Sequence, residues 1–267
     1  MNRSTGAGEP NRTLELLWRH HVPADAERPR RGPERTHTVD QVVDAALTLA
    51  DAEGLEAVSM RALASRLGLS PMSLYTYVPG KAELLDLLVD TAHLRMPRPS
   101  WRRTTGWRTR LTRVAEANRA LLASHPWLTE VASLTRPPLG PGTMAKYEHE
   151  LSAFDGTGLD DVTTDAALAH LLGFVHFHAR AERDAARTAQ ASGLSDAQWW
   201  EANAPVLEVA FDPATYPRAV RVGAAAGQAQ GSAWSAETAW SFGLTCTLDG
   251  LGALIERPRK RSRAQTS

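Results

Sequence analysis

Residues 59–78 decide the fold of this chain, and their sequence is SMRALASRLGLSPMSLYTYV. Ser59 is a candidate N-cap for a first short helix. Gly68 can adopt the turn conformation that ends this helix. Ser70 is a second candidate cap, and Pro71 fits the first position of the next helix because its missing N–H costs nothing there. The stretch therefore predicts two short helices joined by a tight turn, the second running from Pro71 to Val78.

Two helices of this length around a glycine turn have the spacing of a helix-turn-helix. Ala64 is small enough to let them approach closely, and Leu74 would hold the second helix against the core. The exposed side of that helix would then carry groups suited to phosphate oxygens and base edges in a DNA major groove, namely Ser70, Met72, Ser73, Thr76 and Tyr77. Short helical pairs with a glycine turn also occur in ordinary bundles, so spacing alone leaves that alternative open.

Helical periodicity continues on both sides of this pair. Thr38 is a candidate N-cap and Gly54 a candidate stop for a preceding helix, and residues 81–95 form a following one. Further helices are expected at about 107–124, 142–154, 163–190, 196–209, 216–226 and 235–256. No run of alternating strand residues stands out, so the expected fold class is all-α.

The domain organisation follows from these patterns. Residues 1–36 are expected to be a flexible basic leader, residues 37–96 a small N-terminal domain with the helix-turn-helix, residues 97–256 a larger helical domain, and residues 257–267 a basic tail. The arginines at 28–35 would suit an arm that follows an adjacent minor groove or phosphate backbone. A solvated linker is the equal alternative.

Composition sets limits on function. Hydrophobic residues make up 43% of the 267 residues, so the chain can bury a core, and no apolar run is long enough to span a membrane. The single cysteine excludes an internal disulfide and, with no signal-peptide core, favours a cytoplasmic protein. Thirty basic and thirty acidic residues give zero net charge, and residues 36–96 carry four basic residues against eight acidic ones. We therefore expect DNA binding to depend on a dimer, neutral hydroxyl groups and local basic arms.

The stretch 67–85, LGLSPMSLYTYVPGKAELL, resembles the signature of the tetracycline-repressor-like (TetR) transcriptional regulators. The similarity is strong from about residue 38 to 90. It extends more loosely through residues 125–127, 140–141 and 242–251, which are similar to the ligand-binding half of the tetracycline-repressor-type subgroup. The resemblance implies an all-α homodimer in which residues 37–96 are the DNA-binding domain with a connecting helix. Residues 97–256 would be the ligand-binding and dimerisation domain with an inducer pocket. The protein would hence be a repressor that a small molecule releases from its operator.

The resemblance also implies roles for individual residues. Arg61 matches a helix arginine directed at a base or phosphate, and Lys81 matches a phosphate-contacting lysine. Pro71 and Met72 fall on base-facing positions, where apolar groups favour thymine methyls, and Ser73 and Tyr75 fall on phosphate-contacting ones. For Tyr75 and Tyr77 the alternative is packing against the helix that begins after Thr38.

Two C-terminal stretches, residues 163–182 and 235–255, are apolar around most of the helix circumference. Such helices must be buried, either inside a large bundle or against a partner subunit. Aromatic and histidine side chains in this half could line an apolar pocket for a hydrophobic inducer: Trp127, Tyr147, His170, Phe174, Phe177, His178, Trp199 and Trp200. Ordinary core packing is the alternative for each of them.

No metal, cofactor or enzyme active site is predicted. His176 and His178 point to different faces of a helix, and no carboxylate has ligand spacing to them. The family resemblance leaves ligand-assisted binding of Mg²⁺ open. The chain lacks the standard catalytic motifs, and Cys246 in an apolar helix is expected to be inert. An all-α enzyme or a protein-interaction module without an inducer site remain the competing functions.

Overall fold

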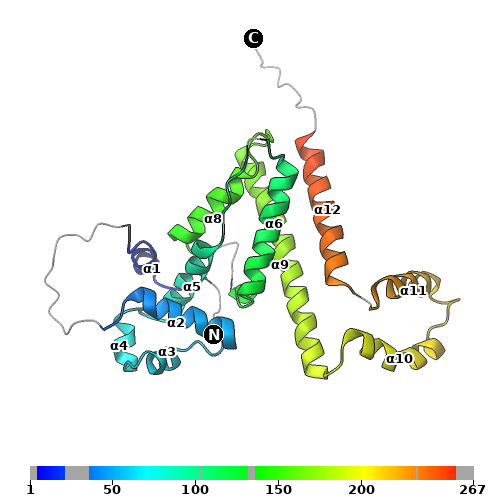
Figure 1. The fold of residues 1–267 in the computed structure, drawn as a ribbon, viewed down its shortest axis with the longest axis horizontal. Helices are drawn as coiled ribbons and strands as arrows, with labels where there is room; N and C mark the ends of the chain where they lie inside the picture. The colour runs from blue at the N-terminus through cyan, green and yellow to red at the C-terminus, as the bar shows by residue number, and fades with distance from the viewer. Residues whose placement is uncertain (1–4, 22–35, 103, 132–135, 233, 257–267) are drawn as a thin grey trace, which may run out of the picture. The chain divides into compact units, whose positions relative to one another are not determined.

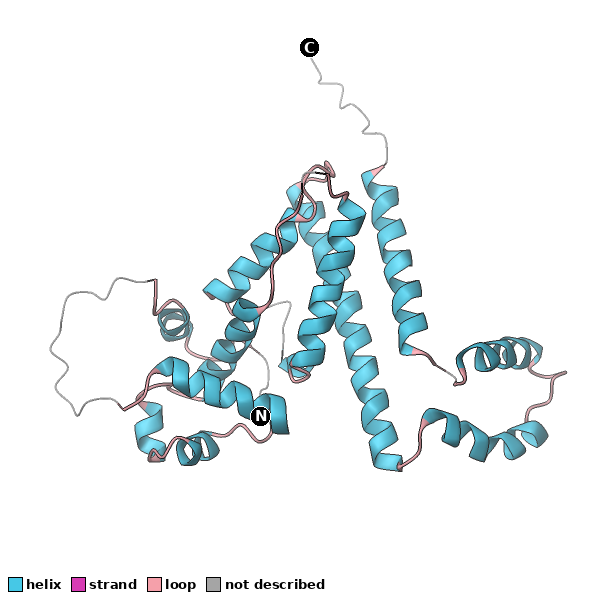
Figure 2. Cartoon of the chain, viewed as in Figure 1, coloured by secondary structure: helices cyan, strands magenta, loops and turns pink. Residues whose placement is uncertain are grey.

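The computed structural model describes residues 5–21, 36–102, 104–131, 136–232 and 234–256. Within these ranges every regular element is a helix and there is no strand, which confirms the all-α fold class (Figure 2). The chain divides into two compact units, Met1–Gly173 and Phe174–Ser267. The tail at 257–267 and the arginine-rich part of the leader lie outside the described residues.

The head of the first unit contains helices α2 (Val39–Glu53), α3 (Met60–Arg66) and α4 (Pro71–Tyr75) (Figure 1). Each of them begins where the sequence predicts, because the side chains of Thr38, Ser59 and Ser70 cap the three N-termini. Their apolar faces meet in a core whose side chains are less than 2% exposed, including Val42, Val43, Leu63, Ala64 and Leu74.

The described part of the leader contains a short helix, α1 (Pro10–Leu17), that the sequence analysis does not predict. Glu9 caps its N-terminus and Leu17 is buried. The segment before α1 is held on α5 (Lys81–Arg95), where the Gly6 N–H donates to Asp86 at 2.9 Å and the Glu9 N–H donates to Glu83 at 3.2 Å. Residues 5–17, called the strap below, are therefore folded, because α5 provides buried carboxylates that accept hydrogen bonds from their N–H groups.

Asp86 makes the strap's attachment sensitive to pH. Burial raises the pKa of Asp86 above 3.8, and the neighbouring charge of Glu83 adds to the rise, against the lowering effect of the Gly6 N–H. The folded state therefore binds this proton more tightly than the unfolded state does. The ionised carboxylate lowers the free energy of unfolding at neutral pH, and this loss is recovered as the pH falls through the folded pKa.

Asp86→Asn should therefore raise the melting temperature at neutral pH, because the amide oxygen still accepts from the Gly6 N–H and carries no charge. The gain should shrink steadily as the pH is lowered to about 4. Thermal unfolding of both proteins across this range measures it. A difference in melting temperature between the two proteins that stays constant with pH would contradict a destabilising charge on Asp86.

Helix α8 (Pro141–Ser152) packs closely on α5. The cap residue of α8 provides no side-chain hydrogen bond, and Asp90 of α5 replaces it by accepting from the N–H groups of Gly142, at 3.2 Å, and Thr143, at 2.8 Å. A Cβ on Gly142 would lie 2.0 Å from the backbone oxygen of Asp90. Glycine is thus required where the two helices cross.

Helix α6 (Trp107–Ser124) and the short α7 (Leu128–Val131) complete the helices that lie wholly in the first unit. Leu111, Leu121 and the polar Asn118 are buried on one face of α6. The Asn118 amide donates to Glu150 of α8 at 2.6 Å, and Lys146 pairs with the same carboxylate at 2.7 Å. A hydrogen-bonded ion pair therefore sets how α6 and α8 meet.

Helix α9 (Asp161–Ser192) runs from the first unit into the second, which also holds α10 (Asp196–Ala210), α11 (Pro217–Gln230) and α12 (Ala236–Ile255). Trp240, Leu244 and Leu248 form the buried stripe of α12. Other apolar side chains remain exposed, including Phe177 at 74% and Phe242 at 72%. None of the described helices is long and apolar enough to cross a membrane.

Candidate nucleic-acid interface

A tight turn joins α3 to α4. Gly68 adopts a φ of +67°, its N–H donates to the Ser65 carbonyl at 3.2 Å, and the Leu69 N–H donates to the Ala64 carbonyl at 2.8 Å. These two bonds form a Schellman motif, which needs a left-handed residue at the glycine position. The turn sets the direction of α4, and the fully buried Leu74 fixes its rotation.

The opposite face of α4 is open to solvent. Met72 is 77% exposed and Tyr75 43% exposed, and Pro71 and Thr76 are exposed beside them. Ser70 and Ser73 cap the helix, with the Ser73 N–H donating to the Ser70 Oγ at 3.1 Å. A helix that exposes a long apolar side chain among hydroxyl groups presents the mixture of contacts that a major groove accepts.

Tyr77 does not belong to this exposed face. Its side chain is 6% exposed, and its hydroxyl accepts from the His37 N–H at 3.4 Å. The expectation of a helix to Val78 is wrong here, because α4 ends at Tyr75 and the change of direction turns Tyr77 into the core. We therefore remove Tyr77 from the DNA-contacting set, and the packing alternative holds for it.

Two basic side chains flank the exposed face. Arg61 is exposed in the first turn of α3, and Lys81 is half-buried as the first residue of α5. Both lie on helices that pack around α2. Their roles toward DNA stay a prediction.

At least six of the eight acidic residues in residues 36–96 are buried or make ion pairs or hydrogen bonds. Asp44 pairs with Arg95, Asp40 with Arg19 and His20, and Asp51 accepts hydrogen bonds from His125 and Trp127. Three further carboxylates are buried on α5, those of Glu83, Asp86 and Asp90. Burial would raise the pKa of Asp40, but hydrogen bonds from Arg19 and His20 outweigh it and lower the pKa. Glu53 and Glu56 are exposed, so residues 36–96 present some negative charge to solvent but less than the composition suggests.

Several of the predicted inducer-lining residues have contacts of their own within one unit. Trp127 is buried and its indole N–H donates to Asp51 of α2 at 2.7 Å, so it joins the first unit's body to the head. The Tyr147 hydroxyl donates to Asp165 at 2.7 Å, and His170 and Phe177 are exposed. Trp199 and Trp200 stack edge to face on α10, 46% and 37% exposed.

Phe174 and His178 do come together, with two tryptophans that the sequence analysis does not assign to the site. The His178 ring lies 5.2 Å from Trp240 and 6.1 Å from Trp234, and Phe174 lies 5.2 Å from Trp240. His178 is 3% exposed, and its Nε2 lies 2.8 Å from the Ala236 carbonyl. Only the apolar character of residues 235–255 indicated Trp240, because about sixty residues separate the two sides of the cluster.

Both halves of the chain match known family models. Residues 42–88 match the bacterial regulatory proteins of the tetR family, and residues 100–255 match the tetracyclin repressor-like C-terminal domain. Helix α1 lies outside both matched stretches.

Individual relatives agree with these matches. The chain is 39% identical over 259 residues to the HTH-type transcriptional repressor DrrR1 of Streptomyces coeruleorubidus, covering 97% of this chain and 92% of that protein. It is 27% identical to the HTH-type transcriptional repressor Rv1353c of Mycobacterium tuberculosis, over 90% of this chain and 88% of that one.

Among solved structures, the TetR family protein ActR of Streptomyces coelicolor in complex with actinorhodin superposes with a TM-score of 0.70 at 26% identity, covering 84% of this chain and 99% of ActR. The fold of this chain thus recurs in a solved protein that it covers along almost its whole length. This chain belongs to the tetR family of bacterial regulatory proteins.

Proposed function

We propose that the protein is a transcriptional repressor that binds operator DNA through α3 and α4. The observation that carries the proposal is the exposed face of α4, where Met72 and the hydroxyl groups project from a helix that Leu74 holds rigidly. Such a face can contact thymine methyls and phosphate oxygens without a strongly positive surface. Regulation is favoured over catalysis because the relatives are named as transcriptional repressors.

We propose further that the repressor acts as a homodimer. Helix α12 buries one stripe and exposes another, made of Phe242, Cys246, Gly250 and Leu254, which recur on one face. Helix α9 exposes Val162 at 81% and Phe177 at 74%. Apolar faces of this kind on two helices fit a second copy of the chain, and a dimer presents two heads to a two-fold-symmetric operator.

The inducer is proposed to be a planar aromatic molecule with a hydroxyl group, bound against Phe174, His178 and Trp240. A carbonyl only accepts hydrogen bonds, so the Nε2 of His178 carries the proton that it donates to Ala236. The other ring nitrogen, Nδ1, is buried and makes no hydrogen bond in the described part of the chain, and the Glu182 carboxylate lies 3.7 Å from it. A ligand hydroxyl group would satisfy it while the rings stack on the ligand.

In this proposal, the junction of α5 and α8 transmits the effect of ligand binding to the heads. Helix α5 follows α4 directly and carries the buried contacts to α8 through Asp90. An inducer that binds one arrangement of the C-terminal helices more tightly than another would shift the heads away from operator spacing. Retardation of DNA from upstream of the protein's own gene tests the repressor proposal, and no retardation at low salt would contradict it.

Actinorhodin, the ligand in the ActR complex, is the first inducer to try. At a hundred times its Kd it should stabilise the fold by about 2.7 kcal/mol and raise the melting temperature by about 5–10 °C. His178→Phe should reduce this rise in melting temperature, because the Nδ1 atom proposed to bond the ligand hydroxyl group is lost while a ring remains. Trp199→Phe, which lies outside the cluster, should leave the rise unchanged. Equal shifts in His178→Phe and the unaltered chain would contradict the role of His178.

A further inference from the structure

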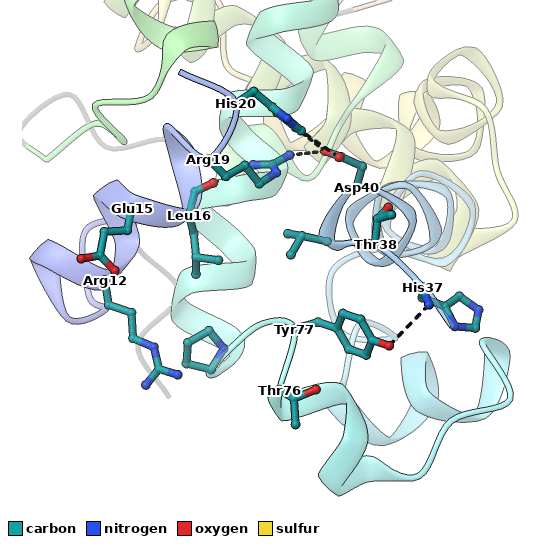
Figure 3. A pocket seen from close by; sticks show the side chains of 12 residues that line it. Arg12, Glu15, Leu16, Arg19, His20, His37, Thr38, Asp40, Thr76 and Tyr77 are labelled. Carbon is teal, nitrogen blue, oxygen red and sulfur yellow. Dashed lines mark hydrogen bonds and ion pairs between the residues drawn. The ribbon is translucent and has the colours of Figure 1, made fainter. Parts of the chain in front are cut away.

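An open cleft of about 690 Å³ lies between α1 and the head (Figure 3). Helix α1 forms one wall and the start of α2 forms another, while the end of α4 and the turn to α5 complete it. Figure 3 shows Arg12 descending from α1 toward the lower side of the cleft, where Thr76 also lies. The cleft therefore adjoins the C-terminal end of the helix proposed to contact DNA.

The outer wall of the cleft is fixed in place. Besides the contacts of Gly6 and Glu9 with α5, the indole N–H of Trp18 donates to the Leu139 carbonyl at 2.7 Å. Leu17 is 2% exposed beneath the helix. A side chain on the outer face of α1 is thus presented from a rigid support, which lowers the entropy lost when it binds a partner.

The charges lining the cleft divide into two groups. Asp40 is committed to Arg19 and His20, so these three groups largely cancel one another. Arg12 and Glu15 are exposed, and the Arg12 guanidinium has no hydrogen-bond or ion-pair partner in the described part of the chain. Thr38 and Thr76 add hydroxyl groups to the lining. Arg12 is therefore the cation available to an anion that enters beside α4.

We propose that this cleft seats the sugar–phosphate backbone of DNA next to the base pairs contacted by α4, with Arg12 as the phosphate contact. The inference rests on the proposed repressor function, because DNA on α4 brings a phosphate chain to the edge of the cleft. It makes α1 an accessory DNA-binding element outside the matched helix-turn-helix. Glu15 opposes the same phosphates and weakens binding to every sequence alike.

Salt dependence of DNA binding tests this contact. Fluorescence anisotropy of the full chain with a labelled duplex from upstream of its own gene would be measured from about 50 to 200 mM NaCl. Arg12→Ala should lower the slope of log Kd against log salt by about 2, since each phosphate contact contributes about 0.9 and a dimer has two. Arg12→Lys should retain the slope, and Glu15→Gln should tighten binding.

Arg113→Ala is the matched control, because Arg113 is an exposed arginine on α6 that does not line the cleft. A slope unchanged in Arg12→Ala, or lowered equally in Arg113→Ala, would overturn the phosphate contact while leaving the repressor proposal intact. Failure of the unaltered chain to bind the duplex would overturn both. An unchanged melting temperature in Arg12→Ala would show that α1 remains folded. The lower salt slope would then be due to the lost contact between Arg12 and a phosphate.

Discussion

Gly142→Ala is expected to lower the melting temperature by about 6–12 °C, corresponding to about 3 kcal/mol of lost stability. The new Cβ would lie 2.0 Å from the Asp90 backbone oxygen and 2.8 Å from the Leu94 nitrogen, so backbone must move. That movement separates α8 from α5 and also breaks the two hydrogen bonds that Asp90 accepts from the N–H groups of residues 142 and 143. Thermal unfolding followed by circular dichroism measures the loss.

Gly223→Ala is the matched control for this substitution. Gly223 lies inside α11, and a Cβ there meets nothing within 4 Å. Alanine should stabilise this helix by about 0.5–1 kcal/mol, because glycine loses more backbone freedom on folding. If both variants were as stable as the unaltered chain, the close crossing of α5 and α8 would be contradicted.

Met72→Asp is expected to weaken binding to the duplex from upstream of the protein's own gene about 100-fold. The carboxylate would stand at the most exposed position of α4, facing phosphates and base edges, and a loss of about 1–3 kcal/mol in each of two heads gives this factor. Because Met72 is 77% exposed, the fold should be unaffected. Anisotropy titrations give the affinities, and thermal unfolding gives the stability.

Thr188→Asp adds the same charge to an exposed position of α9 in the second unit, outside the proposed DNA-contacting helices, and should leave DNA affinity within about twofold. A comparable loss in the two variants would mean that net charge alone governs binding. Full affinity in Met72→Asp would place the DNA-contacting surface elsewhere than α4.

Local signals in the sequence predict the head well. Thr38, Ser59 and Ser70 mark helix starts because a cap needs only its own neighbouring N–H groups, and Gly68 marks a turn for the same local reason. Tyr77 is the exception. Its exposure depends on where α4 ends, and a shift of a few residues there turns the side chain from solvent to core.

The sequence does not reveal which residues far apart along the chain contact one another. Glu83, Asp86 and Asp90 have the appearance of a solvated face, yet they are buried because N–H groups from the strap and from α8 need acceptors. The aromatic cluster joins the second half of α9 to Trp234 and Trp240, and no short motif connects them. Helix periodicity shows that these segments are apolar without showing which side chains meet.

Footprinting tests the central claim, that the exposed faces of two α4 helices read operator DNA as a pair. The measurement is DNase I protection of the region upstream of the protein's own gene, with the unaltered chain and with Met72→Asp. We predict a two-fold-symmetric protected site whose half-sites lie about 10 base pairs, or a multiple of this, apart, and its loss in Met72→Asp. Protection without symmetry, or protection that Met72→Asp retains, would contradict the claim.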